Sequence, residues 1–168
     1  YILVIMKNPK KHILLFLFLF VFTAGEIYAQ FKPEQELTKS EKELFEVSIE
    51  AFNSENYIQS YQGFSQLLSL YPREPVFNLL YGASMIKQNY EIKKAFDPLE
   101  FAVWKGIPEA NFYIGLGYHY LYDFEKAVNF YNEFKSTTKS KVWEDYNIDK
   151  YISQSENGKD LIRYAYEL

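Results

Sequence analysis

The sequence predicts an all-α fold of about three helix pairs stacked side by side and closed by a C-terminal capping helix. Three observations lead to this prediction. A pattern of small and aromatic residues returns about every 34 residues, the length of two helices with their turns. Within each repeat, apolar residues recur at helical spacing, and the long alternating runs typical of strands are missing from the sequence. The 168 residues are 20% aromatic, which suits helices that pack through large rings.

The N-terminal segment, residues 1–29, is predicted to be a secretory signal peptide. Lysines precede the apolar run 13–22, and small residues lead to a cleavage site after Ala29. Residues 1–5 precede Met6 and are expected to lie upstream of the true start. A membrane anchor is the alternative, but ten apolar residues span only about 15 Å of a hydrocarbon core of roughly 30 Å. We therefore expect an exported protein.

A lead-in, residues 30–40, connects this segment to the repeats. Thr38 is followed three residues later by Glu41, a spacing that predicts a capping box at the start of the first helix. The repeats are placed over residues 41–135. Their three units are 41–74, 75–107 and 108–135.

Small residues mark the points where helices are expected to cross. Ser48, Gly82 and Gly115 recur at intervals of 34 and 33 residues. Two helices approach closely only where the side chains between them are small. Gly115 and Gly117 lie in one predicted helix, so we expect this Gly-x-Gly to serve packing rather than phosphate binding.

A capping element is predicted over residues 136–158. A polar turn opens it, and apolar residues then recur at helical spacing as far as Ser155. Asn157 and Gly158 are expected to end this helix. Residues 159–168 are interpreted as the start of a truncated C-terminal region.

The repeated pattern over residues 41–135 resembles the tetratricopeptide repeat. Pro72 and Pro108 stand near the family's closing position, whereas the fourth position of each unit lacks the family's tryptophan. The resemblance implies a right-handed superhelix in which the first helix of each pair lines the concave side.

A narrower resemblance rests on the signal peptide, the three repeats and the run 155–162. Together these features are similar to the N-terminal part of bacterial cell-envelope proteins, one of them from the type nine secretion and gliding machinery. In those proteins the repeats precede a β-propeller and a peptidoglycan-binding domain similar to outer-membrane protein A. The resemblance implies a protein associated with the periplasm or the outer membrane. Contacts with peptidoglycan or outer-membrane components would then belong to C-terminal domains that lie beyond this sequence.

The first helices of the three units predict a concave groove that is almost entirely apolar. Its residues are Phe45, Ile49, Phe52, Leu79, Ala83, Ile86, Phe112, Leu116 and His119. An apolar surface of this size must be covered by something. The cover is either a partner peptide or helix, or a segment of the same chain such as residues 30–37 or those after 158. If a partner covers it, the groove residues should not be needed for folding.

The sequence carries few residues that suit catalysis or cofactor binding. It holds no cysteine, and His119 is the one histidine that remains after signal removal. Metal sites and Ser-His pairs need more partners than this, so we expect no enzyme activity, no metal and no cofactor, and we expect His119 to be a groove contact. A net charge of −4 argues against nucleic-acid binding.

The function predicted from these observations is a non-catalytic protein–protein interaction or scaffolding module of a bacterial cell-envelope assembly, with a protein or peptide as partner. The alternative is a ligand- or substrate-recognition domain of an outer-membrane uptake system. The missing lipid-acceptor cysteine after the signal peptide argues against that alternative.

Overall fold

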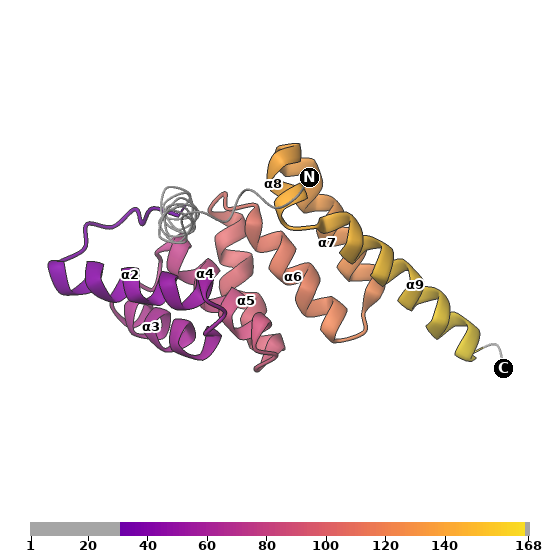
Figure 1. The fold of residues 1–168 in the computed structure, drawn as a ribbon, viewed down its shortest axis with the longest axis horizontal. Coiled ribbons are helices and arrows are strands. Elements are labelled where there is room, and N and C mark those ends of the chain that lie inside the picture. The colour runs from indigo at the N-terminus through magenta and orange to yellow at the C-terminus, as the bar shows by residue number, and fades with distance from the viewer. Residues whose placement is uncertain (1–30, 167–168) are drawn as a thin grey trace, which may run out of the picture. The chain divides into compact units, whose positions relative to one another are not determined.

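The computed structural model describes residues 31–166, and within them the predicted all-α fold is confirmed: eight helices are present and no strand (Figure 1). The predicted signal peptide, 1–29, lies outside the described residues. The helices are α2 (Lys39–Asn53), α3 (Tyr57–Leu70), α4 (Pro75–Lys87), α5 (Ile92–Trp104), α6 (Glu109–Tyr120), α7 (Phe124–Thr137), α8 (Ser140–Asp145) and α9 (Ile148–Tyr166).

The helices of residues 33–166 pack as successive pairs. Helix α2 packs on α3, α4 on α5, and α6 on α7, while α3 also contacts α4 and α5 contacts α6. Helix α9 packs on α7 after the third pair (Figure 1). Because each pair is apolar on two faces, it buries both only when a neighbour stacks on each side. This arrangement explains why the sequence pattern repeats every two helices.

Small residues lie at the helix crossings, as the sequence predicts. A Cβ atom on Gly82 would lie 2.6 Å from Leu99 Cγ, and one on Gly115 would lie 2.7 Å from the Tyr131 ring. In the first pair, Gly63 of α3 leaves room for the Ser48 hydroxyl of α2. Glycine within a helix costs about 1 kcal/mol relative to alanine, and here the close approach of two helices explains its use.

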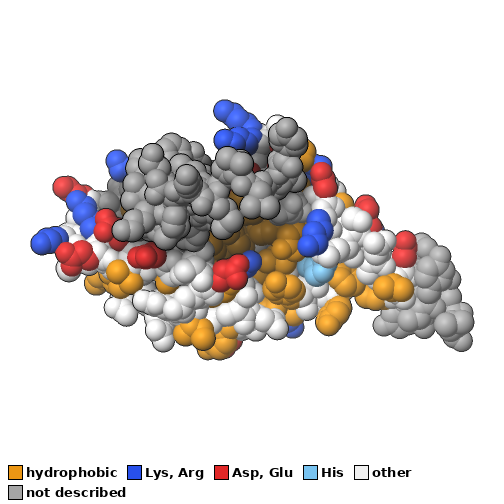
Figure 2. Space-filling model, in the orientation of Figure 1, with side chains coloured by type: hydrophobic (Ala, Val, Ile, Leu, Met, Phe, Trp, Pro, Cys, Tyr) orange, Lys and Arg blue, Asp and Glu red, His pale blue; other side chains and the backbone are white. Residues whose placement is uncertain are grey.

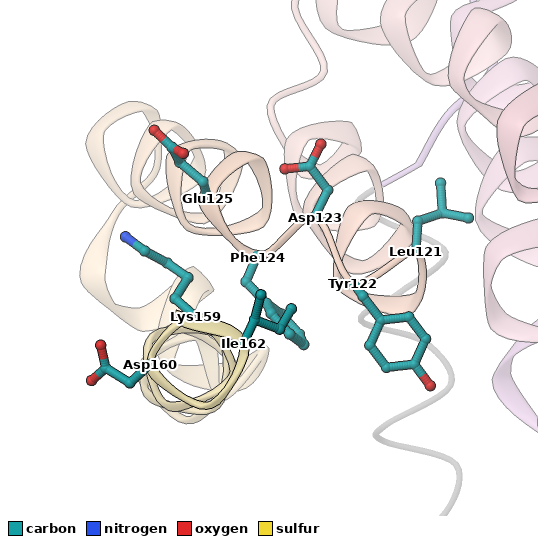
Figure 3. Close-up of a pocket in the computed structure, with 8 residues that line it drawn as sticks. All are labelled: Leu121, Tyr122, Asp123, Phe124, Glu125, Lys159, Asp160 and Ile162. Atoms are coloured by element: carbon teal, nitrogen blue, oxygen red, sulfur yellow. The ribbon is translucent and has the colours of Figure 1, made fainter. Parts of the chain in front are cut away.

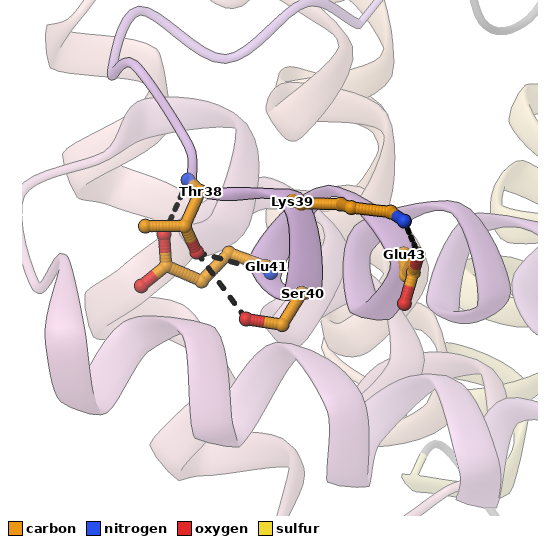
Figure 4. Close-up of polar contacts among 5 residues, drawn as sticks. All are labelled: Thr38, Lys39, Ser40, Glu41 and Glu43. Carbon is orange, nitrogen blue, oxygen red and sulfur yellow. Dashed lines mark hydrogen bonds and ion pairs between the residues drawn. The ribbon is translucent and has the colours of Figure 1, made fainter.

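The predicted capping box at the start of α2 is present (Figure 4). The Glu41 amide donates to Thr38 Oγ1 at 3.4 Å, and the Thr38 amide donates to Glu41 Oε2 at 2.8 Å. Glu41 Oε2 also accepts a hydrogen bond from the Tyr71 hydroxyl at 2.9 Å. These hydrogen bonds stabilise the carboxylate and lower the pKa of Glu41, with the Thr38 amide as the largest cause. The box therefore also ties the start of α2 to the end of α3.

In the turn inside each pair, the second residue after the first helix has left-handed backbone conformation. These residues are Glu55 (φ 62°), Asn89 (φ 54°) and Tyr122 (φ 61°). At each turn two amides return to carbonyls of the preceding helix, as Tyr122 to His119 and Asp123 to Tyr118 do. This is the Schellman arrangement, which usually places glycine at the left-handed position.

The lead-in is hydrogen-bonded to the carboxylate of Glu74, a contact that the sequence did not predict. Glu74, at the start of α4, is only 1% exposed. Its Oε2 accepts hydrogen bonds from the amides of Glu34 (3.0 Å) and Gln35 (3.1 Å), and its Oε1 accepts one from the Val76 amide (3.3 Å). One buried carboxylate thus caps α4 and fixes the chain that precedes α2.

The C-terminal cap differs from the single helix predicted to end at Asn157 and Gly158. It contains two helices separated by Asn147, which has a φ of 53°, and α9 continues through Gly158 to Tyr166. The prediction of a stop at Gly158 is wrong for a physical reason. A Cβ atom there would lie 2.5 Å from the Phe124 ring, so this glycine allows α9 to pack against the start of α7.

Three aromatic rings from consecutive helices form a stack. The ring of Tyr118 on α6 lies between those of Phe96 on α5 and Phe130 on α7. The centroid distances are 4.6 and 5.5 Å and the interplanar angles 21° and 15°. Such stacked rings contribute more than their buried area alone. The stack therefore joins the second pair to the third.

Candidate functional site

The nine residues predicted to line the groove lie on the first helices of the three pairs. Three are on α2, three on α4 and three on α6. Seven are buried and two, Phe52 and His119, are partly buried. The buried ones are Phe45, Ile49, Leu79, Ala83, Ile86, Phe112 and Leu116.

Phe45 lies in the core between the first and second pairs. Its ring contacts those of Phe64 on α3, at 6.1 Å, and Phe77 on α4, at 5.7 Å. The sequence placed Phe45 in the groove because it stands at the expected position of a first helix, and it left open whether a partner or the chain itself covers it. Since the second pair supplies Phe77, the chain itself covers this position.

Phe112 is likewise covered by residues of its own chain. Its ring centroid lies 4.7 Å from that of Tyr146 and 5.4 Å from that of Tyr151 on α9. The rings of Tyr131 and Phe134 on α7 also contact it. These covering rings belong to α7 and to the predicted cap, 136–158. The Tyr131 hydroxyl is buried in this cluster without a hydrogen-bond partner among the described residues, and burial raises its pKa.

Gly117 and Gly115 serve close packing, as predicted. A Cβ atom on Gly117 would lie 2.6 Å from the Phe96 ring and 2.9 Å from Ile86 Cδ1. Ile86 of α4 therefore packs against α6 at Gly117. The sequence had predicted that Ile86 lines the groove. Both glycines lie within α6 rather than in a loop, so their amides are used by the helix.

His119 joins α6 to the cap through a hydrogen bond. Its Nδ1 lies 2.8 Å from the Ser155 Oγ of α9, and its ring packs edge-on against Phe124 at 5.2 Å. Burial lowers the pKa of His119 below its ordinary value of 6.5. Ser155 is fully buried, so its hydroxyl meets the imidazole inside the protein rather than at a surface that a substrate can reach. The sequence reading missed this pair because the two residues are 36 positions apart.

The partly buried end of the predicted groove is formed by aromatic rings from different pairs. Phe52 on α2 contacts Tyr57 on α3 at 5.4 Å and Tyr113 on α6 at 6.2 Å. The Lys87 ammonium of α4 lies 5.3 Å from the Tyr57 ring centroid. Burial raises the pKa of Tyr57 to about 12, so its hydroxyl stays protonated near neutral pH. We call Phe52, Tyr57, Lys87 and Tyr113 the aromatic junction.

The sequence reading did not find Tyr57, Lys87 or Tyr113 as groove residues. Tyr57 lies at the start of a second helix, and Lys87 and Tyr113 each stand one position after a predicted groove residue, Ile86 and Phe112. Hydrophobic side chains gather around the histidine on the face shown in Figure 2. In the junction the rings of Phe52 and Tyr57 and the Lys87 side chain remain partly exposed, whereas Tyr113 is buried.

Two features of other proteins are not found in the described residues, 31–166. These residues contain no group of three or more His, Asp or Glu side chains placed to hold a metal ion. None of their helices has the length and apolar character needed to cross a membrane.

Comparison with known proteins does not assign the chain to a family. The chain matches no protein-family model, and a search of curated proteins finds no match either.

Proposed function

We propose that this chain is a non-catalytic protein–protein interaction module, acting as a scaffold in a bacterial cell-envelope assembly. It binds a partner peptide or helix on the concave side of its first helices. The aromatic junction carries this proposal, because residues from all three pairs meet there. Aromatic rings that keep part of their surface exposed are the usual anchors of protein interfaces.

The position of the junction supports binding rather than folding as its main role. Phe52 and Tyr57 are partly buried, whereas core residues such as Phe64 and Phe77 are fully buried. Lys87 adds a positive charge beside the rings. A partner that presents an apolar side chain next to a carboxylate would match both features.

The experiment compares Phe52→Ser with Val47→Ser, a control on the same helix whose side chain is 48% exposed. Each variant is used to capture crosslinked partners from a solubilised envelope fraction, and its melting temperature is measured. We expect Phe52→Ser to lose partners about ten-fold or more while its melting temperature stays close to that of Val47→Ser. Equal capture by both variants would show that the junction is not the binding surface.

Export is tested separately, by N-terminal sequencing of the protein recovered from the periplasm. A first residue of Gln30 supports the predicted cleavage after Ala29. Protein that retains the apolar run 13–22 would contradict it.

A further inference from the structure

Three tyrosines meet at the boundary between the first and second pairs. Tyr61 on α3 stacks on Tyr81 on α4, with ring centroids 5.0 Å apart and an interplanar angle of 23°. The ring of Tyr90, in the turn between α4 and α5, packs edge-on with that of Tyr61 at 5.7 Å. We call Tyr61, Tyr81 and Tyr90 the tyrosine cluster. Phenylalanine rings pack in the same ways, so packing alone does not explain three hydroxyls.

The boundary between the second and third pairs is built with phenylalanine instead. Its stack holds the phenol of Tyr118 between the rings of Phe96 and Phe130. Close packing at such a boundary therefore does not need two phenols in contact. The same molecule provides a matched comparison for the tyrosine cluster.

Tyr61 and Tyr81 are the most closely stacked phenols among residues 31–166. Two further pairs of tyrosine rings are in contact outside the cluster, both at steeper angles: Tyr113 with Tyr146 at 77°, and Tyr131 with Tyr151 at 40°. Each of those pairs has one buried member, whereas Tyr61 and Tyr81 are both partly exposed. The stacked pair is thus the one that a reagent in solution can reach.

Tyr90 is held in place by an unusual turn. Asn89 and Glu91, on either side of it, both have left-handed backbone, with φ of 54° and 42°. The turns of the first and third pairs are one residue shorter and contain one such residue each. A left-handed glutamate is unfavourable, and strain of this kind is found at functional sites. The turn keeps Tyr90 against the cluster with 45% of its surface exposed.

Phenols in contact have a specific reactivity. A one-electron oxidant removes an electron and the hydroxyl proton from tyrosine, and the radical spreads over the oxygen and the two ring carbons beside the C–O bond. Two such radicals form a bond between these carbons, and the hydrogen on each carbon then moves to restore the hydroxyls. The product, dityrosine, has two hydrogen atoms fewer than two tyrosines. Coupling within one chain therefore selects rings that already lie together.

The surroundings of the cluster keep its protons in place until oxidation. Burial raises the pKa of Tyr81, and a hydrogen bond with Tyr61 adds to the effect. The Glu91 carboxylate raises the pKa of Tyr90. Both phenols are therefore protonated near neutral pH, and each must lose its proton together with an electron.

We infer that Tyr61 and Tyr81 form an oxidative cross-linking site, which a haem peroxidase working with hydrogen peroxide converts to dityrosine. One peroxide molecule takes up the two electrons and two protons and becomes two molecules of water. Tyr90 is the entry point, because it is exposed and its ring contacts Tyr61. The first electron that Tyr90 loses is replaced through Tyr61 from Tyr81, and the second is replaced from Tyr61, each with a proton.

The new bond joins α3 to α4, and so the first pair to the second. The sequence contains no cysteine, so no disulfide can make this connection. A covalent link between positions 61 and 81 restricts the unfolded chain in the way that a disulfide does. The tyrosine cluster therefore gives a cysteine-free chain a means of fixing two helix pairs together.

Tyr122 shows what exposure alone provides. Its side chain is 73% exposed, beside the pocket between the α6–α7 turn and α9 (Figure 3). The ring in contact with it is that of Phe124, at 6.0 Å, and among the described residues no second phenol contacts it. We therefore expect an oxidised Tyr122 to couple only between molecules.

The test treats the full chain, at high dilution, with a haem peroxidase and hydrogen peroxide. The monomer is isolated by gel filtration and digested with trypsin, which separates the three tyrosines of the cluster because it cleaves after Arg73 and Lys87. We expect the monomer to show the blue fluorescence of dityrosine. Mass spectrometry should find peptide 43–73 joined to peptide 74–87 with the loss of two hydrogen atoms, and fragmentation should place the link at Tyr61 and Tyr81.

Four variants identify the residues responsible. Tyr61→Phe keeps the ring and removes the hydroxyl, so it should abolish the cross-link while the melting temperature stays close to that of the native chain. Tyr90→Phe should slow the reaction, because it removes the entry point. Tyr118→Phe and Tyr122→Phe, which lie outside the cluster, should leave the yield of dityrosine in the monomer unchanged.

The inference is overturned if the oxidised monomer contains no dityrosine, if the link lies at Tyr113 or Tyr131, or if Tyr61→Phe gives the native yield. Equal rates in Tyr90→Phe and the native chain would show that the oxidant reaches the stacked pair directly, and the role given to Tyr90 would be wrong. Dityrosine found only in dimers, and lost in Tyr122→Phe, would show that exposure rather than stacking decides the site.

Discussion

His119 shows how one partly buried side chain can make stability depend on pH. Its imidazole accepts or donates one hydrogen bond with Ser155 and packs against the rings of Phe124 and Tyr151. Burial disfavours the charged form, so its pKa in the folded chain lies below 6.5. The unfolded chain therefore takes up the proton first as the pH falls. The stabilisation by neutral His119 is complete above 6.5 and is lost as the pH falls through 6.5 toward the lower folded value.

We expect the free energy of unfolding of the native chain to decline as the pH falls from neutral through 6.5, and this decline to be shallower in His119→Gln. Glutamine keeps a polar group near Ser155 but does not titrate. The measurement is urea unfolding at several pH values for both chains. Parallel pH profiles would show that His119 does not cause the decline.

Single residues also show what the sequence could and could not predict. Thr38 and Glu41 form the predicted capping box because all its groups lie within four residues. The contacts of Glu74 with residues 34 and 35, and of His119 with Ser155, join positions 36 to 40 apart. No local pattern identifies such pairs, so they were found only in the structure.

At the scale of elements, the sequence predicts the three helix pairs and a capping element, but not its division into two helices or where α9 ends. Each pair is marked by a small residue in its first helix and by rings in its second. Gly158 allows two predictions from sequence alone, because glycine often ends a helix and also permits two helices to pack closely. The position of the Phe124 ring decides between them, and that position depends on how α9 docks.

Gly158→Leu should therefore detach α9 from α7, although leucine favours a helix more than glycine does. The added side chain would overlap the Phe124 ring, and such overpacking costs about 1–3 kcal/mol. We expect faster amide exchange along α9 while α2 to α5 keep their protection, because a stack of helix pairs transmits disruption mainly to its neighbours. Hydrogen exchange followed by mass spectrometry measures this. Uniform loss of protection in all helices would contradict it.

At the scale of the whole stack, residues 33–166, most of the residues predicted to line the groove are part of the core. The sequence identified the first-helix positions, but whether they face solvent depends on later helices. Phe112 illustrates this, because Tyr146 and Tyr151 cover it only once the cap has docked. Periodicity predicts which residues share a helix face. Which other helix packs on that face depends on how the later helices fold back onto it.

Phe112→Ala should consequently destabilise the whole third pair and its cap. Phe112 is 5% exposed and contacts rings of α7 and α9, so its truncation should cost about 3–5 kcal/mol and lower the melting temperature by roughly 10 °C. Val47→Ala, on an exposed face of α2, should change it little. Thermal melting of the two variants is the measurement. An unchanged melting temperature in Phe112→Ala would mean that this ring lies on an open surface.

The stack of Phe96, Tyr118 and Phe130 also has an optical consequence. Three nearly parallel chromophores from three helices couple their electronic transitions, and the coupling is lost when α5, α6 and α7 separate even slightly. Near-ultraviolet circular dichroism is sensitive to such fixed packing, while the far-ultraviolet signal follows the helices alone. The protein thus contains its own spectroscopic reporter of how the second pair sits on the third, and it needs no added label.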